Sequence, residues 1–152
     1  MPIKSFRGLM ADNTQDTIVL HTNDGSVGYK IVKFELMPSN PGGAAGEHVV
    51  QIWKVSQTAN SNDIDFSNNI LLGAGYASNA TSGDSEPTRQ SVIFDSEVFN
   101  QDIYVTHKIQ NGSGSINYYI ELEQVKLDLS ENTVATLKDI RNIERDSTVT
   151  IP

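Results

Sequence analysis

A period-two alternation of apolar and polar residues is the feature that most constrains what this chain can fold into. Within residues 27–37, Val32, Phe34 and Leu36 share one parity, and residues 116–122 repeat the pattern. Successive side chains of a β-strand point to opposite faces, so both segments are expected to be strands with one buried face. The expected core residues are Val32, Phe34, Leu36, Ile116, Ile120 and Leu122.

Apolar runs separated by segments rich in Asn, Ser and Gly extend the strand prediction over most of the chain. The expected strands cover residues 17–22, 27–37, 48–56, 70–76, 91–94, 103–108 and 116–129. The turn signal at 23–26 predicts a hairpin between the first two strands, and residues 110–115 predict another between the last two. This spacing predicts a mainly β protein, an antiparallel β-sandwich for which the jelly roll is one candidate topology.

The last predicted strand changes its apolar parity. Leu122 ends one apolar series, and Val125 and Leu127 belong to the other. Because a strand repeats every two residues, the change predicts a bulge, a twist or a new packing partner near residues 123–124.

Residues 130–145 are the one segment with helical periodicity. Apolar residues recur there at every third position, Ser130 can cap the N-terminus, and basic residues gather toward the other end, as the helix dipole favours. We therefore expect one C-terminal α-helix.

The chain is expected to form a single domain over residues 1–152, with short arms at 1–12 and 146–152. Both arms carry apolar side chains, and an extended segment that cannot bury such side chains on its own core can bury them on a partner, often by strand addition. The candidate assembly contacts are Ile3, Phe6, Leu9, Met10, Val149 and Ile151.

Composition argues against several classes of function. The chain has 152 residues, no cysteine and a formal net charge of −8. The lack of cysteine excludes disulfide scaffolds, thiol catalysis and cysteine-rich zinc sites. So acidic a chain is poorly suited to bind nucleic acid directly. We expect no membrane segment, because no apolar run reaches the roughly 20 residues of a membrane helix, and the N-terminal segment lacks a signal-peptide pattern.

No motif in the sequence assembles a catalytic or cofactor-binding site. His21, His48 and His107 are widely separated, whereas a metal site needs at least three converging ligands. The segment 63–67 begins like a calcium loop but lacks the later glycine and glutamate of an EF-hand. The glycines at 73–75 lack the third glycine of a nucleotide-binding loop. We therefore expect no enzymatic activity, no metal and no cofactor.

Several distinctive strings of residues point to one family. They are Lys4-Ser5-Phe6-Arg7-Gly8, Gln15-Asp16-Thr17-Ile18, Leu20-His21-Thr22-Asn23-Asp24-Gly25, Gly28-Tyr29-Lys30-Ile31, Glu47-His48-Val49-Val50, Asp65-Phe66-Ser67, Asn117-Tyr118-Tyr119-Ile120-Glu121-Leu122-Glu123 and Val134-Ala135-Thr136-Leu137-Lys138-Asp139-Ile140-Arg141. With this set, the chain resembles a family of small virion structural proteins encoded by tailed bacteriophages of marine bacteria.

The resemblance implies a capsid decoration or cement protein, made in the host bacterial cytoplasm and located in the virion. Its expected partners are the major capsid protein or other virion proteins, together with further copies of itself. The same resemblance is compatible with a component of the tail, neck or fibre.

A third interpretation, from another class, is a carbohydrate-binding β-sandwich module. Such a module needs exposed aromatic side chains on one face. The candidates are Trp53, Tyr76, Tyr104, Tyr118 and Tyr119, of which Tyr118 is expected in the core because it shares a parity with its apolar neighbours.

Overall fold

The computed structural model describes residues 2–21, 26–41, 45–79 and 88–127. Eight strands account for most of them: β1 (Ile3–Met10), β2 (Thr14–Ile18), β3 (Val27–Pro38), β4 (Gly46–Trp53), β5 (Leu71–Ser78), β6 (Thr88–Ile93), β7 (Ile103–Gly112) and β8 (Ile116–Lys126). The predicted helix at 130–145, the arm at 146–152 and the contacts Val149 and Ile151 lie outside the described residues. Within the described ranges, no helix has the length and apolar character needed to cross a membrane.

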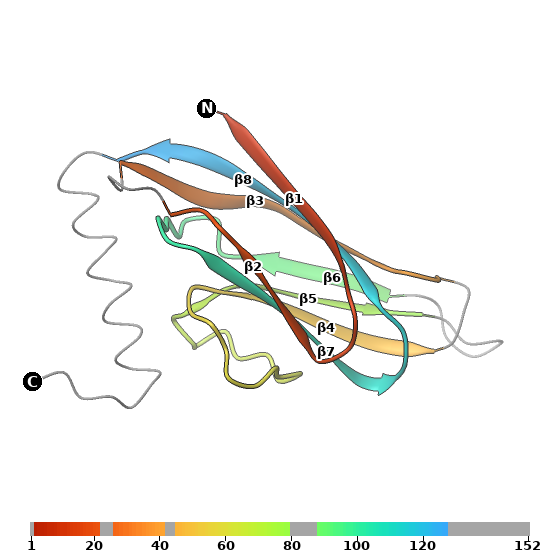
Figure 1. Cartoon of the computed structure of the whole chain (residues 1–152). Coiled ribbons are helices and arrows are strands. Elements are labelled where there is room, and N and C mark those ends of the chain that lie inside the picture. The colour runs from red at the N-terminus through yellow and green to blue at the C-terminus, as the bar shows by residue number, and fades with distance from the viewer. Residues whose placement is uncertain (1, 22–25, 42–44, 80–87, 128–152) are drawn as a thin grey trace, which may run out of the picture.

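The strands form two antiparallel sheets, as the sequence predicted. One has three strands in the order β1-β8-β3, and the other has five in the order β2-β7-β4-β5-β6. Figure 1 shows the three-stranded sheet lying across the five-stranded one. Strand β7 returns beside β4 after the consecutive strands β4, β5 and β6, which is the order of a Greek key.

The core lies between the two sheets and contains most of the residues predicted for it. Phe34 and Leu36 are at most 4% exposed, and the side chains of Ile116, Ile120 and Leu122 are fully buried. They pack in one cluster with side chains of the five-stranded sheet, including Val50, Ile52, Leu72 and Val105. The period-two pattern therefore identified the buried face of β3 and β8 correctly.

Val32 is the exception among the predicted core residues. The register between β3 and β8 shifts between Ile31 and Lys33, so Val32 is only half-buried, and Ile31, 1% exposed, takes the core position instead. A bulge adds one residue and reverses the parity of the strand. The irregularity predicted at 123–124 of β8 thus lies in β3, nearly opposite, while the pairing of β8 itself stays continuous.

Both predicted hairpins are wrong, because the chain crosses between the sheets at those points. Strand β2 pairs with β7, whereas β3 pairs with β8. Strands β7 and β8 also belong to different sheets. A turn signal indicates that the chain reverses, but it does not indicate whether the next strand continues the same layer.

The segment predicted as an N-terminal arm, 1–12, is instead largely β1, an edge strand that pairs with β8 along its whole length. Its even residues face inward, so Met10 is 1% exposed and Phe6 packs against the core. Its odd residues face outward, leaving Ile3 and Leu9 51% and 60% exposed. Of the four predicted N-terminal contacts, Phe6 and Met10 serve the chain's own core, and only Ile3 and Leu9 face solvent.

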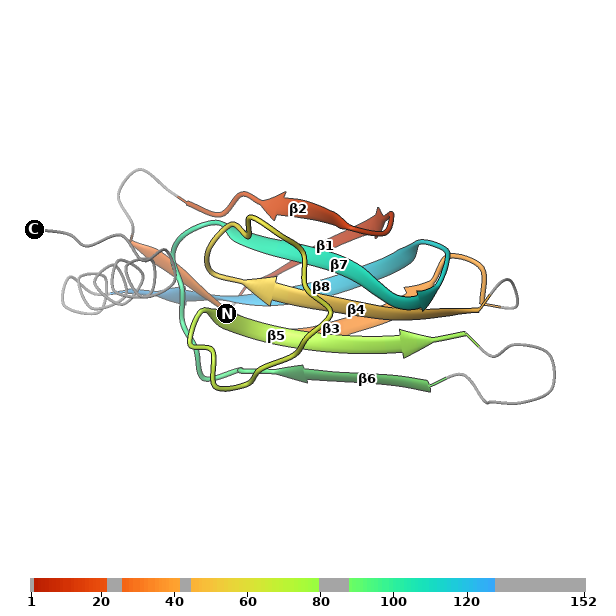
Figure 2. The same ribbon diagram turned by 90° about the horizontal axis from the view of Figure 1, so that it is seen from below.

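The outer faces of the two sheets differ. A loop over residues 54–70 crosses the outer face of the five-stranded sheet (Figure 2). The Gln51 side-chain amide donates hydrogen bonds to the carbonyls of Ser61 and Asp63 in this loop, and Trp53 packs there with Ile70. The outer face of the three-stranded sheet has no such cover among the described residues.

Replacing Phe34 by Ala should lower the free energy of unfolding by about 3–5 kcal/mol, because the ring is 3% exposed and its loss leaves a cavity between the sheets. Urea unfolding followed by circular dichroism measures the change. The matched control is Met37→Ala on the same strand, where the side chain is 54% exposed and the expected loss is about 0.5 kcal/mol. Equal losses for the two variants would contradict this core.

Candidate functional site

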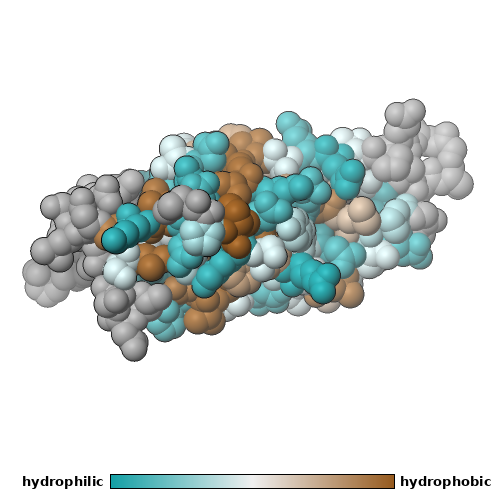
Figure 3. Space-filling model, turned by 90° about the horizontal axis from the view of Figure 1, so that it is seen from above, coloured by the Kyte–Doolittle hydropathy of each residue, from teal (hydrophilic) through white to brown (hydrophobic). Residues whose placement is uncertain are grey.

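The outer face of the three-stranded sheet presents a groove that crosses all three strands. The register aligns Arg7, Tyr119 and Glu35 in one row and Leu9, Asn117 and Met37 in the next. Between these rows lies a groove of about 540 Å³ that all six residues line. We call it the cross-strand groove. Figure 3 views this face and shows apolar surface interrupted by polar side chains.

Gly8 and Tyr118 lie under this groove, between its two rows. The Tyr118 hydroxyl points inward and donates a 3.0 Å hydrogen bond to Asp16 Oδ2. A Cβ at Gly8 would lie 2.9 Å from that hydroxyl, so only glycine leaves room for this buried contact. Burial raises the pKa of the Tyr118 phenol, and Asp16 raises it further.

Tyr119 is the aromatic side chain of the groove. Its hydroxyl donates a 2.6 Å hydrogen bond to Glu121 Oε2, which raises the pKa of the Tyr119 phenol. Lys33 Nζ lies 6.0 Å from the ring centroid, and Lys33 does not line the groove. The hydrogen bond and the lysine both favour this orientation of the ring.

Two of the other aromatic candidates are buried, and two are half-buried like Tyr119 but lie outside the groove. Trp53 and Tyr118 are each 6% exposed, and Trp53 Nε1 donates to Thr106 Oγ1. Tyr76 and Tyr104 are half-buried on the five-stranded sheet. Tyr118 is in the core, as its parity predicted.

The second surface feature is the open edge of β1. The carbonyl of Pro2 accepts a hydrogen bond from Gln124 N of β8. Because backbone groups alternate along a strand, the even residues of β1 face β8 and the odd residues direct N–H and C=O to the edge. These odd residues are Ile3, Ser5, Arg7 and Leu9. Among the described residues, no group hydrogen-bonds to the backbone of these four residues.

The opposite edge of the same sheet is protected. Tyr29 of β3 exchanges two backbone hydrogen bonds with Phe99, at 2.7 and 2.9 Å. Farther along β3, Ser91 Oγ donates to the Phe34 carbonyl and Arg89 donates to the Leu36 carbonyl. Side chains of β6 therefore occupy the acceptors of β3 that face away from β8.

Two histidines form a buried pair between β4 and β7. His48 and His107 are both fully buried, with His48 Nδ1 2.9 Å from His107 Nε2. His107 Nδ1 lies 2.9 Å from the Ala11 carbonyl. A carbonyl can only accept, so His107 Nδ1 carries the proton, and a neutral His107 then accepts at Nε2 from His48 Nδ1–H.

This order of donors leaves His48 Nε2 as an acceptor. It is buried and has no hydrogen-bond partner among the described residues. It adjoins a cavity of about 150 Å³ that includes Ser113 and Ser115 in its lining. Because no described serine donates to His48 Nε2, the cavity contains no activated nucleophile of the Ser–His kind in the described part of the chain.

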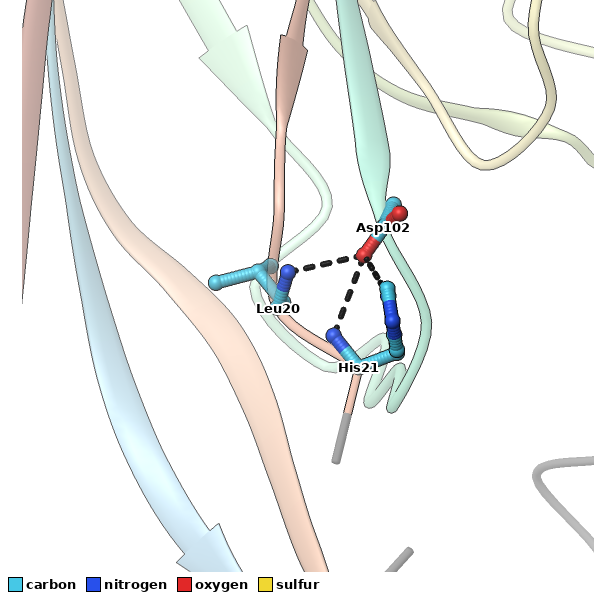
Figure 4. Close-up of polar contacts among 3 residues, drawn as sticks. All are labelled: Leu20, His21 and Asp102. Carbon is cyan, nitrogen blue, oxygen red and sulfur yellow. Dashed lines mark hydrogen bonds and ion pairs between the residues drawn. The ribbon is translucent and has the colours of Figure 1, made fainter. Parts of the chain in front are cut away.

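A third polar contact ties the end of β2 to the start of β7. Figure 4 shows Asp102 Oδ1 accepting hydrogen bonds from the backbone N–H of Leu20 and His21, and from the His21 ring. The ring nitrogen Nδ1 lies 2.7 Å from Asp102 Oδ1. Partial burial raises the pKa of Asp102, but these hydrogen bonds outweigh it and the pKa is lowered. The contact fixes the chain where it leaves the five-stranded sheet.

The possible calcium segment at 63–67 forms a local turn. Asp65 Oδ1 accepts hydrogen bonds from the backbone N–H and the hydroxyl of Ser67, and the hydroxyl's hydrogen bond is the main cause of a lowered pKa of Asp65. Within the described ranges, no three His, Asp or Glu side chains converge as metal ligands.

No protein-family model matches the chain, and no curated protein matches it either.

The stability of the protein should fall as the pH drops from 7.5 to 5.5. Burial lowers the pKa of His48 and of His107 below 6.5, the value expected in the unfolded chain. The unfolded chain therefore binds more protons, and stability decreases by up to about 1.4 kcal/mol per pH unit for each imidazole. Urea unfolding at several pH values measures this slope.

A His48→Gln, His107→Gln double variant should have a flatter slope. An unchanged slope in the double variant would contradict neutral buried imidazoles.

Proposed function

We propose that this chain is a structural protein of a bacteriophage virion, a decoration or cement protein that stabilises the lattice of the major capsid protein. The observation that carries the proposal is the open edge of β1. Four residues direct backbone N–H and C=O groups outward there, and two of them, Ile3 and Leu9, add exposed apolar side chains. An extended segment of a capsid subunit can pair with such an edge and cover those side chains.

The strand order supports a jelly-roll β-sandwich for this protein. Eight strands lie in two sheets, and both connections that the sequence predicted as hairpins cross from one sheet to the other. The order β7-β4-β5-β6 supplies one Greek key, and jelly rolls contain two. Jelly-roll domains serve in viral capsids and in lectins.

The charge of the chain supports an external position. A net charge of −8 opposes contact with packaged DNA. The family resemblance of the sequence supports the same assignment. A position in the tail, neck or fibre uses the same edge but in a ring rather than on the head lattice.

Quantitative mass spectrometry of purified virions tests the assignment. A head decoration protein should occur in a fixed, near-stoichiometric ratio to the major capsid protein. A copy number that matches a single ring would assign the protein to the tail or neck instead. Absence from virions that contain the other structural proteins would refute a virion role.

Replacing Ser5 by Pro tests the open edge directly. Ser5 directs its N–H away from β8, so proline removes a donor for an added strand without breaking the pairing of β1 with β8. We expect binding to purified capsid shells to weaken roughly tenfold, by loss of a hydrogen bond and steric conflict.

Ser5→Ala is the matched control for this test. It removes the same hydroxyl but keeps the backbone N–H, and should bind as tightly as the unaltered protein. Thermal unfolding establishes that both variants are folded. If a folded Ser5→Pro variant binds capsid shells with unchanged affinity, the edge of β1 is not the docking element.

A further inference from the structure

We infer that the cross-strand groove is a binding site for an uncharged saccharide, a function separate from assembly through the edge of β1. The groove places one aromatic ring, Tyr119, beside a guanidinium, a carboxylate and an amide from three different strands. Its volume of about 540 Å³ lies within the roughly 300–1,000 Å³ of small-ligand sites.

The aromatic ring supplies a stacking surface. Lys33 Nζ lies over the Tyr119 ring, 6.0 Å from its centroid, and Tyr119 is one of the residues that line the groove. The hydroxyl is held by Glu121, so the ring is oriented before any ligand arrives. A pyranose ring carries C–H groups on its faces, and these apolar faces stack on an aromatic ring fixed in this way.

The polar side chains of the groove supply hydrogen bonds of both kinds. Arg7 offers only donors, Glu35 only acceptors, and Asn117 both. All three residues are exposed, and none of their side chains has a hydrogen bond or ion pair to another described residue. Each hydroxyl of a sugar can both donate and accept a hydrogen bond. A sugar therefore matches the donors and acceptors of these three side chains better than an apolar peptide does.

The charged side chains that line the groove are those of Arg7, Glu35 and Arg89. Arg7 and Glu35 lie on either side of Tyr119 in one row, so their opposite charges largely cancel at the ring, and the guanidinium of Arg89 donates a hydrogen bond to the Leu36 carbonyl. The chain as a whole carries a charge of −8, which repels anionic polysaccharides. On the far side of the groove, Leu9 and Met37 offer apolar contact to a second sugar ring or to its C–H face.

The groove and the edge of β1 share the Leu9 side chain and otherwise use different groups. The groove uses the side chains of Arg7, Glu35, Asn117 and Tyr119, whereas the edge uses the backbone N–H and C=O groups of β1. Variants at Tyr119, in the middle strand, alter the groove without altering the edge. The two proposals can therefore fail independently.

The test is isothermal titration of the full chain with cellohexaose, maltohexaose, mannohexaose, galactohexaose and chitohexaose. We expect at least one of them to bind with a Kd of about 1 mM or tighter. Hexagalacturonate, an anionic probe of similar length, should bind at least tenfold more weakly than the best neutral probe. Failure of all five neutral probes to bind, or preferential binding of the anionic one, would overturn the inference.

Substitutions at Tyr119 locate the site. Tyr119→Ala removes the stacking surface and should weaken binding of the best probe at least tenfold. Tyr119→Phe keeps the ring and loses only the hydrogen bond to Glu121, so it should retain most of the affinity. Tyr104→Ala, on the other sheet, should have no effect. Unchanged binding by Tyr119→Ala would overturn the assignment.

Chemical-shift mapping on the unaltered protein tests the site without any substitution. Titration of the best neutral probe into 15N-labelled protein should shift the amide signals of Arg7, Glu35, Asn117 and Tyr119. Shifts confined to other parts of the chain would overturn the groove as the saccharide site, even if the Tyr119 variants failed to fold.

Discussion

The pairing of β8 with β1 on one side and β3 on the other is the constraint on which the rest of the structure depends. The even residues of β8 include Ile116, Ile120 and Leu122, which are all fully buried. Burial of each of these side chains contributes roughly 1.5–3 kcal/mol to the stability of the fold. The odd residues of β8 include Asn117 and Tyr119 on the opposite face. One strand therefore builds the centre of the core and, through the same alternation, the middle of the cross-strand groove.

The bulge in β3 makes the two edges of this sheet different. Before the shift at Ile31, Tyr29 directs its backbone groups toward Phe99, and after it Phe34 and Leu36 direct their carbonyls toward β6. Every one of these groups finds a partner. The edge of β1 has no such partners among the described residues, so it carries the unprotected hydrogen-bonding capacity of the sheet.

The buried histidine pair adds a polar element to the five-stranded sheet. A hydrogen-bonded line runs from His48 through His107 to the Ala11 carbonyl, and Asp12 Oδ1 accepts from Ile109 N nearby. Buried polar groups are tolerated when they are hydrogen-bonded, and here the line ties the connection between β1 and β2 to β7. The two imidazoles therefore join the two sheets as well as neighbouring strands.

The sequence by itself determined most of the strand segments and which face of β3 and β8 is buried, because alternation is local and can be read from residues such as Phe34 and Ile120. It missed β1, which was predicted as an arm and becomes a strand by pairing with β8. Only the tertiary structure decided strand partners, because pairing depends on how all apolar faces pack together; hence the two predicted hairpins were wrong. The row of Arg7, Glu35 and Tyr119 shows the consequence for the site. The position of Tyr119 in the alternating pattern of β8 indicated that its side chain faces outward. Its alignment with Arg7 and Glu35, which are distant in sequence, depends on the register of strand pairing.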